Sequence, residues 1–174
     1  PDGKIPTLNR TGLMTQDRDP FSEAFIEEAQ RCGMPVLEVG AAYGITTIEA
    51  LKRGAVVVAN DIDPRHLIIL RQRTPKEYYK NLYLDASAFP KETNFPNDTF
   101  GAVLMCRVAH LFTPEEMELS LDKIEKILKP GGKLYITTIS PYHHEFANFQ
   151  EIYNERWEKG IKWPGVITNL KDYL

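Results

Sequence analysis

The sequence has few of the features that mark disulfide-bonded, zinc-binding or membrane-spanning proteins. It contains only two cysteines, Cys32 and Cys106, and no Cys/His spacing that resembles a zinc site. We therefore expect two free thiols in a reducing compartment, the cytoplasm. The longest purely aliphatic run, "AVVVA" at 55–59, is far too short to span a bilayer. No signal peptide is recognisable.

The chain also lacks an excess of positive charge. It has 21 basic and 24 acidic residues, for a net charge of -3. Phosphate binding usually appears as an excess or cluster of Lys and Arg, so nucleic acid is not an expected partner. A length of 174 residues with 43% hydrophobic content suits one domain with one sizeable core. We see no internal repeat.

Apolar runs and helical periods alternate along the middle of the chain. The pattern predicts helices over 19–33, 45–54, 63–73 and 113–132, and strands over 35–40, 55–61, 81–86, 99–107 and 133–139. Residues 1–20 read as a loose lead-in. This alternation predicts an α/β fold with a doubly wound, mostly parallel sheet in a three-layer sandwich. Ligands of such sheets bind beyond the carboxyl ends of the strands.

The turn after the first predicted strand, in "VLEVGAAYG" at 36–44, combines glycines with a carboxylate. Gly40 and Gly44 permit a close approach of backbone to a ligand, but Ala42 stands where a dinucleotide fingerprint has its middle glycine. A Walker loop is absent as well. Glu38 would repel a phosphate and suits a cationic ligand, although it also fits a structural role bonded to backbone amides.

Acidic residues follow the next two strands. Asp61 is placed to accept hydrogen bonds from both ribose hydroxyls of a nucleoside, and Asp85 from an exocyclic amine of a purine. The alternative is that each serves only as a turn or cap residue. The ligand that these residues describe has adenine, ribose, no phosphate and a positive charge, which is the description of S-adenosylmethionine.

Five motifs in order resemble the class I S-adenosylmethionine-dependent methyltransferases, the Rossmann-like methyltransferase family. They are "VLEVGAAYG", "VVANDID", "LYLDASAFP", "FPNDTFGAVLMCRVAHLF" and "ILKPGGKLYITT", and together they cover roughly residues 34–139. The resemblance implies a cofactor site made by Glu38, Gly40, Ala41, Gly44, Asp61, Ile62, Asp85, Ala86, Cys106 and Arg107. In this family Ile62 would lie against the adenine, and Cys106 and Arg107 would face the sulfonium and substrate.

Three histidines are candidates for a general base, since histidine titrates near neutrality. They are His110, which follows the fourth strand, and His143 and His144, which follow the fifth. Each also fits a role without catalysis. His110 would then be a structural or solvated residue, and the other two would lie in an exposed loop. Cys106 likewise fits an inert buried thiol.

The resemblance also sets expectations for the domain layout. Residues 21–140 would form the cofactor-binding core, and the aromatic segment 141–174, with a helix near 145–159, would cover the substrate. The family sheet ends in a two-strand hairpin, and we expect this chain to stop before it, as a fragment or truncated product. An exposed apolar sheet edge would follow.

The expected activity is methyl transfer to a small-molecule acceptor, with a protein side chain as the second choice of acceptor. The Asn/Asp-Pro-Pro-Tyr/Phe motif, which by resemblance marks amine methylation of nucleobases and some proteins, is missing after the fourth strand, so those substrates are less expected. Two other classes stay open at this point. One is a dehydrogenase on a nucleotide-binding sheet, and the other is a non-catalytic module that keeps the fold.

Overall fold

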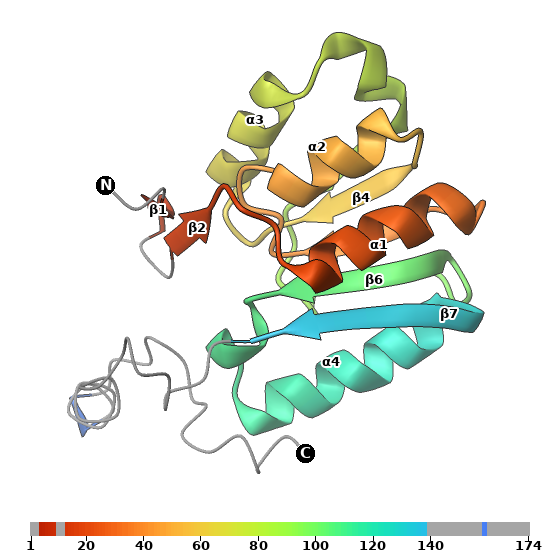
Figure 1. Cartoon of the computed structure of the whole chain (residues 1–174). Coiled ribbons are helices and arrows are strands. Elements are labelled where there is room, and N and C mark those ends of the chain that lie inside the picture. The colour runs from red at the N-terminus through yellow and green to blue at the C-terminus, as the bar shows by residue number, and fades with distance from the viewer. Residues whose placement is uncertain (1–3, 10–12, 139–157, 160–174) are drawn as a thin grey trace.

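Five parallel strands form the centre of the molecule in the computed structural model, which describes residues 4–9, 13–138 and 158–159. Their order is β5-β4-β3-β6-β7, so the chain starts in the middle, builds to one edge and crosses to the other side (Figure 1). The bounds are β3 Val36–Val39, β4 Val57–Asn60, β5 Leu82–Asp85, β6 Phe100–Cys106 and β7 Leu128–Thr137. The predicted doubly wound parallel sheet is confirmed, and its topological switch point lies between β3 and β6.

In the described part of the chain, one α-helix precedes the first strand of this sheet and three connect its strands, each close to its predicted place. They are α1 Pro20–Arg31, α2 Ile45–Lys52, α3 Pro64–Arg73 and α4 Pro114–Ile127, with 3-10 turns η1 Lys76–Asn81 and η2 Ala109–Leu111. Three of the helices begin with a proline after a capping side chain: Asp19 for α1, Asp63 for α3 and Thr113 for α4. The capping box between Thr113 and Glu116 is present as predicted.

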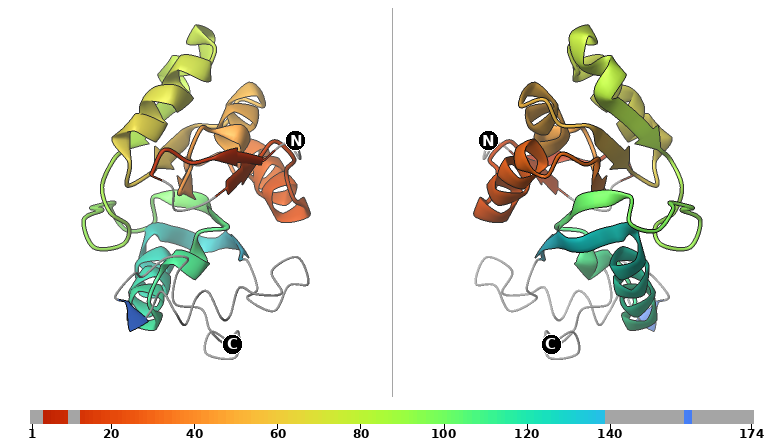
Figure 2. Two further views of the ribbon diagram at one scale, coloured as in Figure 1. Left: turned by 90° about the vertical axis from the view of Figure 1, so that its left-hand side faces the viewer. Right: turned by 90° about the vertical axis from the view of Figure 1, so that its right-hand side faces the viewer.

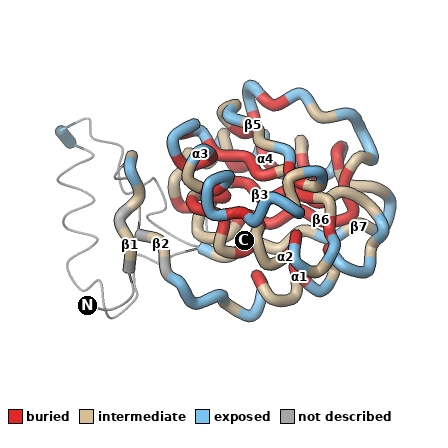
Figure 3. The backbone as a smooth tube through the Cα atoms, turned by 90° about the horizontal axis from the view of Figure 1, so that it is seen from above, coloured by how far each residue is buried: buried red, intermediate tan, exposed pale blue. Residues whose placement is uncertain are grey.

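The sheet is covered on both faces, which gives three layers. In β3 the side chains of Val36 and Leu37 belong to two separate apolar clusters, one on each face. The first cluster takes residues from α1, α2 and α3, and the second takes residues from α4. Figure 2 shows α4 on the opposite side of the sheet from the other helices. The inner strands β3, β4 and β6 are buried along almost their whole length, in the interior that Figure 3 colours red.

The N-terminal stretch differs from the predicted loose lead-in. Two short strands, β1 Lys4–Pro6 and β2 Leu13–Thr15, pair antiparallel as an N-terminal hairpin. Strands of three residues show no readable alternation, so the sequence pattern could not reveal them. The N-terminal hairpin lies beyond the carboxyl ends of β4, β6 and β7 (Figure 1), on the side where ligands of such sheets bind.

The fourth helix ends earlier than predicted. We expected it to run to the Pro130–Gly132 turn, but α4 stops at Ile127 and β7 begins at Leu128. Leu128 pairs with Phe100, the first residue of β6, and the register shifts before Lys133 pairs with Ala102. The Pro-Gly-Gly turn is therefore an irregularity inside the strand. Pairing with a distant strand overrides the local helix pattern here.

Other expectations fall on the C-terminal part of the chain. The helix near 145–159 and the substrate-covering segment 141–174 lie outside the described residues, except for Glu158 and Lys159. Both remain predictions, as does the expected lack of the last two strands. Within the residues that are described, no helix is both long and apolar enough to cross a bilayer.

Candidate functional site

A cavity of about 600 Å³ opens at the carboxyl ends of β3, β4 and β6. Its size falls in the usual range for small-molecule sites. Seven of the predicted cofactor residues line it: Glu38, Gly40, Ala41, Asp61, Ile62, Cys106 and Arg107. Gly44, Asp85 and Ala86 are not among the lining residues. The sheet topology thus brings most of the predicted site together.

The turn after β3 holds a left-handed backbone at three positions. Gly40 has φ 73° and Gly44 has φ 79°, values that suit glycine. A Cβ atom on Gly40 would clash with Val108, and one on Gly44 would clash with Leu70. Ala42 has φ 44°, where a residue with a side chain is strained. The turn needs glycine geometry at the position where this sequence has alanine.

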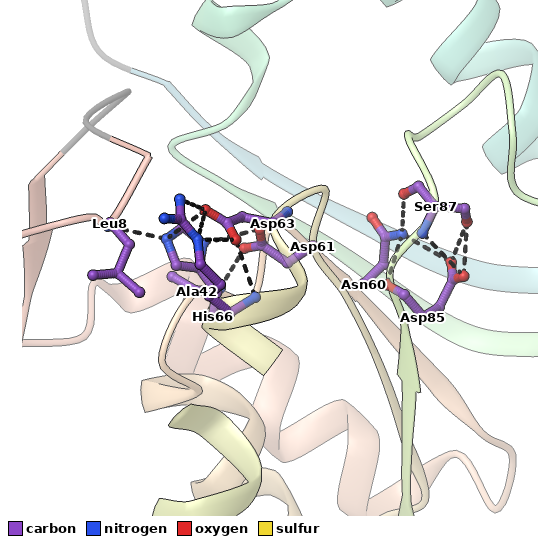
Figure 4. Close-up of polar contacts among 9 residues, drawn as sticks. Leu8, Ala42, Asn60, Asp61, Asp63, His66, Asp85 and Ser87 are labelled. Atoms are coloured by element: carbon purple, nitrogen blue, oxygen red, sulfur yellow. Dashed lines mark hydrogen bonds and ion pairs between the residues drawn. The ribbon is translucent and has the colours of Figure 1, made fainter. Parts of the chain in front are cut away.

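Asp61 is held by the protein on three sides. Its Oδ1 accepts from the backbone N–H of Asp63 at 2.9 Å and lies 3.0 Å from Nδ1 of His66 (Figure 4). Its Oδ2 accepts from the backbone N–H of Ala42 at 2.9 Å. A carboxylate offers about four lone-pair sites, so one acceptor site, on Oδ2, is left for a ligand. The prediction that Asp61 accepts from both ribose hydroxyls stays a prediction.

Glu38 is a buried carboxylate that lines the cavity. Burial raises its pKa to about 7, and the nearby charge of Asp61 adds to the rise. Hydrogen bonds from Thr47 and Thr46 oppose it, including a short one from the Thr47 hydroxyl. No described residue forms an ion pair with Glu38 in the structure. A cation in the cavity would favour the ionised form.

Ile62 is an exposed apolar side chain at the cavity, where a flat apolar ligand could cover it. It lines the cavity, yet 64% of its surface is exposed. It follows Asp61 directly, so an apolar face stands beside the remaining acceptor of the carboxylate. This combination fits an adenosine, whose base is flat and whose ribose carries hydroxyl donors.

The carboxylate of Asp85 accepts hydrogen bonds from neighbouring residues, and Asp85 does not line the cavity. Its Oδ2 accepts from the side-chain amide of Asn60 at 2.8 Å, and both oxygens accept from the Ser87 hydroxyl (Figure 4). The same Asn60 amide donates to the Ser87 carbonyl at 2.8 Å. Asn60 does line the cavity, so this cluster fixes a residue of the site. Direct contact of Asp85 and Ala86 with adenine stays a prediction.

The end of β6 brings Cys106 against the start of α1. Its thiol donates to Asp19 Oδ2 at 3.2 Å, and burial raises its pKa. Burial alone would raise the pKa of Asp19 as well, but bonds from the Ser22 N–H, the Cys106 thiol and the Phe21 N–H lower it below its ordinary value. Asp19 thus supplies a negative charge at the cavity wall.

His110 is placed less favourably for a catalytic role. His110 lies on η2 and is buried, and burial lowers its pKa to about 4, so it is neutral and weakly basic. Within the described part of the chain its Nδ1 has no hydrogen-bond partner, and it does not line the cavity. His143 and His144 fall outside the described residues. A general-base role for any of the three stays a prediction.

Sequence reasoning missed one side of the cavity. Thr7, Asn9 and Met14 of the N-terminal hairpin and Asp17, Arg18 and Asp19 before α1 also line it. His66, which bonds to Asp61, was read only as part of a helix. The one feature of the sequence that could have pointed to this side of the cavity was the placement of Asp19 and Pro20 at the start of a helix. Among the described residues no group of three possible metal ligands is found.

The sequence matches known methyltransferases. The profile of the methyltransferase domain family covers residues 37–136. Demethylmenaquinone methyltransferase of Tropheryma whipplei is 33% identical over 121 residues, which are 70% of this chain and 48% of that protein. The chain therefore spans about half the length of this relative.

Solved structures give the same fold. A glycopeptide N-methyltransferase in complex with S-adenosylmethionine aligns with a TM-score of 0.55 and 22% identity, over 65% of this chain and 48% of that one. A Burkholderia thailandensis 1,6-didemethyltoxoflavin-N1-methyltransferase, with its acceptor and S-adenosylhomocysteine bound, aligns with a TM-score of 0.55 and 24% identity, over 66% and 48%. At this identity the likeness shows the fold.

Proposed function

Because this chain belongs to the methyltransferase domain family, we propose that it transfers a methyl group from S-adenosylmethionine to a small-molecule acceptor. The observation that carries the proposal is the convergence of Glu38, the Gly40 turn, Asp61 and Ile62 on one cavity. The family match removes the basis for a dehydrogenase. Methylation of a protein side chain is the second choice of acceptor.

The residues present fit this cofactor at both of its ends. Ile62 and the open acceptor of Asp61 suit the adenosine. The Gly40–Gly44 turn and Glu38 suit the amino-acid end, where the ligand carries an ammonium group. A buried carboxylate with a pKa near 7 is stabilised in its charged form by such a cation. Cys106 and Arg107, at the end of β6, would face the sulfonium and the acceptor.

S-Adenosylmethionine, when bound, supplies a methyl group already activated on a sulfonium, so the chain has mainly to orient and to exclude water. Gly40 allows the backbone to come close to the ligand, and Val108 closes the space behind it. Burial of Cys106 keeps its thiol protonated, so that thiol does not compete as a nucleophile. No described residue has to form a covalent intermediate.

The lining of the cavity supports a small, partly apolar acceptor. Apolar side chains are among its lining residues: Met14, Val108, Leu111 and Phe112. The names of two similar proteins also give small-molecule acceptors, demethylmenaquinone and 1,6-didemethyltoxoflavin. The C-terminal segment 141–174 remains our candidate for the substrate cover.

A turnover assay tests the proposal. The chain is incubated with S-adenosylmethionine and a panel of small aromatic and quinol-like acceptors, and release of S-adenosylhomocysteine is measured. We expect acceptor-dependent release that is lost in Gly40→Val. Binding of the cofactor with no release for any small or protein acceptor would favour a non-catalytic module instead.

A further inference from the structure

One hydrogen bond joins the N-terminal hairpin to the cofactor-binding part of the sheet. The backbone N–H of Leu8, between β1 and β2, donates to Nε2 of His66 at 3.1 Å, although the two residues are 58 positions apart (Figure 4). Residues on both sides of Leu8, Thr7 and Asn9, line the cavity. The bond therefore fixes a wall of the site.

His66 is held rigidly between that wall and Asp61. Only 1% of its surface is exposed, and its ring meets Tyr43 edge to face at 5.3 Å. Its Nδ1 lies 3.0 Å from Asp61 Oδ1. An ionised carboxylate can only accept, and a backbone N–H can only donate. Both bonds are satisfied together when Nδ1 carries the proton and Nε2 is the acceptor.

Simple burial does not explain the bond to Leu8. Leu8 is 44% exposed, so water could take its N–H at little cost if the N-terminal hairpin lay elsewhere. Asp61 likewise already has two backbone donors, Ala42 and Asp63. What the imidazole adds is a link between the N-terminal hairpin and the carboxylate that faces the ligand.

We propose that His66 is a positioning residue for cofactor binding, which seats the N-terminal hairpin over the site and orients Asp61 toward the ribose. The inference rests on the proposed function. It makes the N-terminal hairpin part of the cofactor site, and loosening that hairpin speeds cofactor release. His66 itself does not touch the reacting atoms.

Two substitutions separate the two bonds of the imidazole. In His66→Asn the amide can still donate to Asp61 but is too short to reach Leu8. In His66→Gln the longer side chain can place its carbonyl oxygen at Leu8 and gives up the bond to Asp61. Hydrogen exchange of the Leu8 amide in the full chain without cofactor reports the first contact. Calorimetry with S-adenosylhomocysteine reports the effect on the site.

We expect Leu8 exchange to accelerate about fivefold to tenfold in His66→Asn, and the affinity for S-adenosylhomocysteine to fall by a similar factor through faster dissociation. His66→Gln should keep Leu8 protected. Protected amides of β3 and β4 serve as the control for folding. Leu8→Pro removes the N–H without touching the buried histidine, and Leu8→Ala is its matched control.

The outcomes are distinguishable. Weaker cofactor binding in both His66→Asn and Leu8→Pro, with Leu8→Ala like the wild type, supports the inference. Unchanged affinity in those two variants, or unchanged Leu8 exchange in His66→Asn, overturns it while leaving the proposed function intact. If the wild-type chain binds no S-adenosylhomocysteine, the proposed function fails, and this inference fails with it.

Discussion

Replacing Glu38 with glutamine should stabilise the ligand-free protein while weakening its site. The carboxyl is buried, and its pKa is raised from the ordinary 4.5 to about 7. Each pKa unit corresponds to about 1.4 kcal/mol, so ionising Glu38 in the fold costs about 3 kcal/mol relative to the unfolded chain. Glutamine has the same shape, can still accept from Thr47, and carries no charge to bury.

The direction of the pKa shift of Glu38 determines the pH range over which the stability changes. The folded pKa is higher than the unfolded one, so the stability contributed by protonated Glu38 is complete below pH 4.5 and is lost as pH rises through about 7. Glu38→Gln should therefore match the wild type in free energy of unfolding near pH 4.5. At pH 8 it should be more stable by about 3 kcal/mol.

Urea unfolding followed by circular dichroism at pH 4.5, 6 and 8 measures this difference. Glu49→Gln is the matched control, because Glu49 lies on α2 in a partly exposed ion pair with Lys52 and should show a gap of at most about 0.5 kcal/mol. A stability gap between Glu38→Gln and wild type that stays constant from pH 4.5 to 8 would refute the reasoning.

Three further predictions concern the same site. Ala42→Gly should raise the free energy of unfolding by about 1 kcal/mol in urea titrations, because φ 44° strains a residue with a side chain; no gain would mean that the turn is relaxed. Gly40→Ala should lower it by about 2–3 kcal/mol, and adding Val108→Ala should recover only the part due to the clash. The affinity for S-adenosylmethionine should rise about tenfold from pH 6 to pH 8 in calorimetry as Glu38 ionises, and Glu38→Gln should abolish that rise.

The predictable features of this chain are those encoded by local pattern. The capping side chains Asp19, Asp63 and Thr113 stand next to prolines, so the helix starts could be placed almost to the residue. The alternation of strands and helices predicted the parallel sheet. The parallel sheet in turn predicted that Glu38 and Asp61 would lie at the same edge, at the carboxyl ends of the strands.

The unpredicted features all depend on contacts between distant residues. The end of α4 is set by pairing of Leu128 with Phe100, which helix periodicity does not contain. The role of His66 depends on Leu8, and the N-terminal hairpin has strands too short to show alternation. The count of free acceptors on Asp61 likewise required its protein partners to be known.

The central claim is that the cavity at the carboxyl ends of the strands binds S-adenosylmethionine through Asp61. Calorimetric titration of S-adenosylhomocysteine into the wild type and into Asp61→Asn, with NADH as the control ligand, tests it most directly. We expect one site in the wild type, at least tenfold weaker binding in the variant because a charged acceptor is lost, and no binding of NADH. Absence of binding to the wild type, or equal binding to both proteins, would contradict the claim.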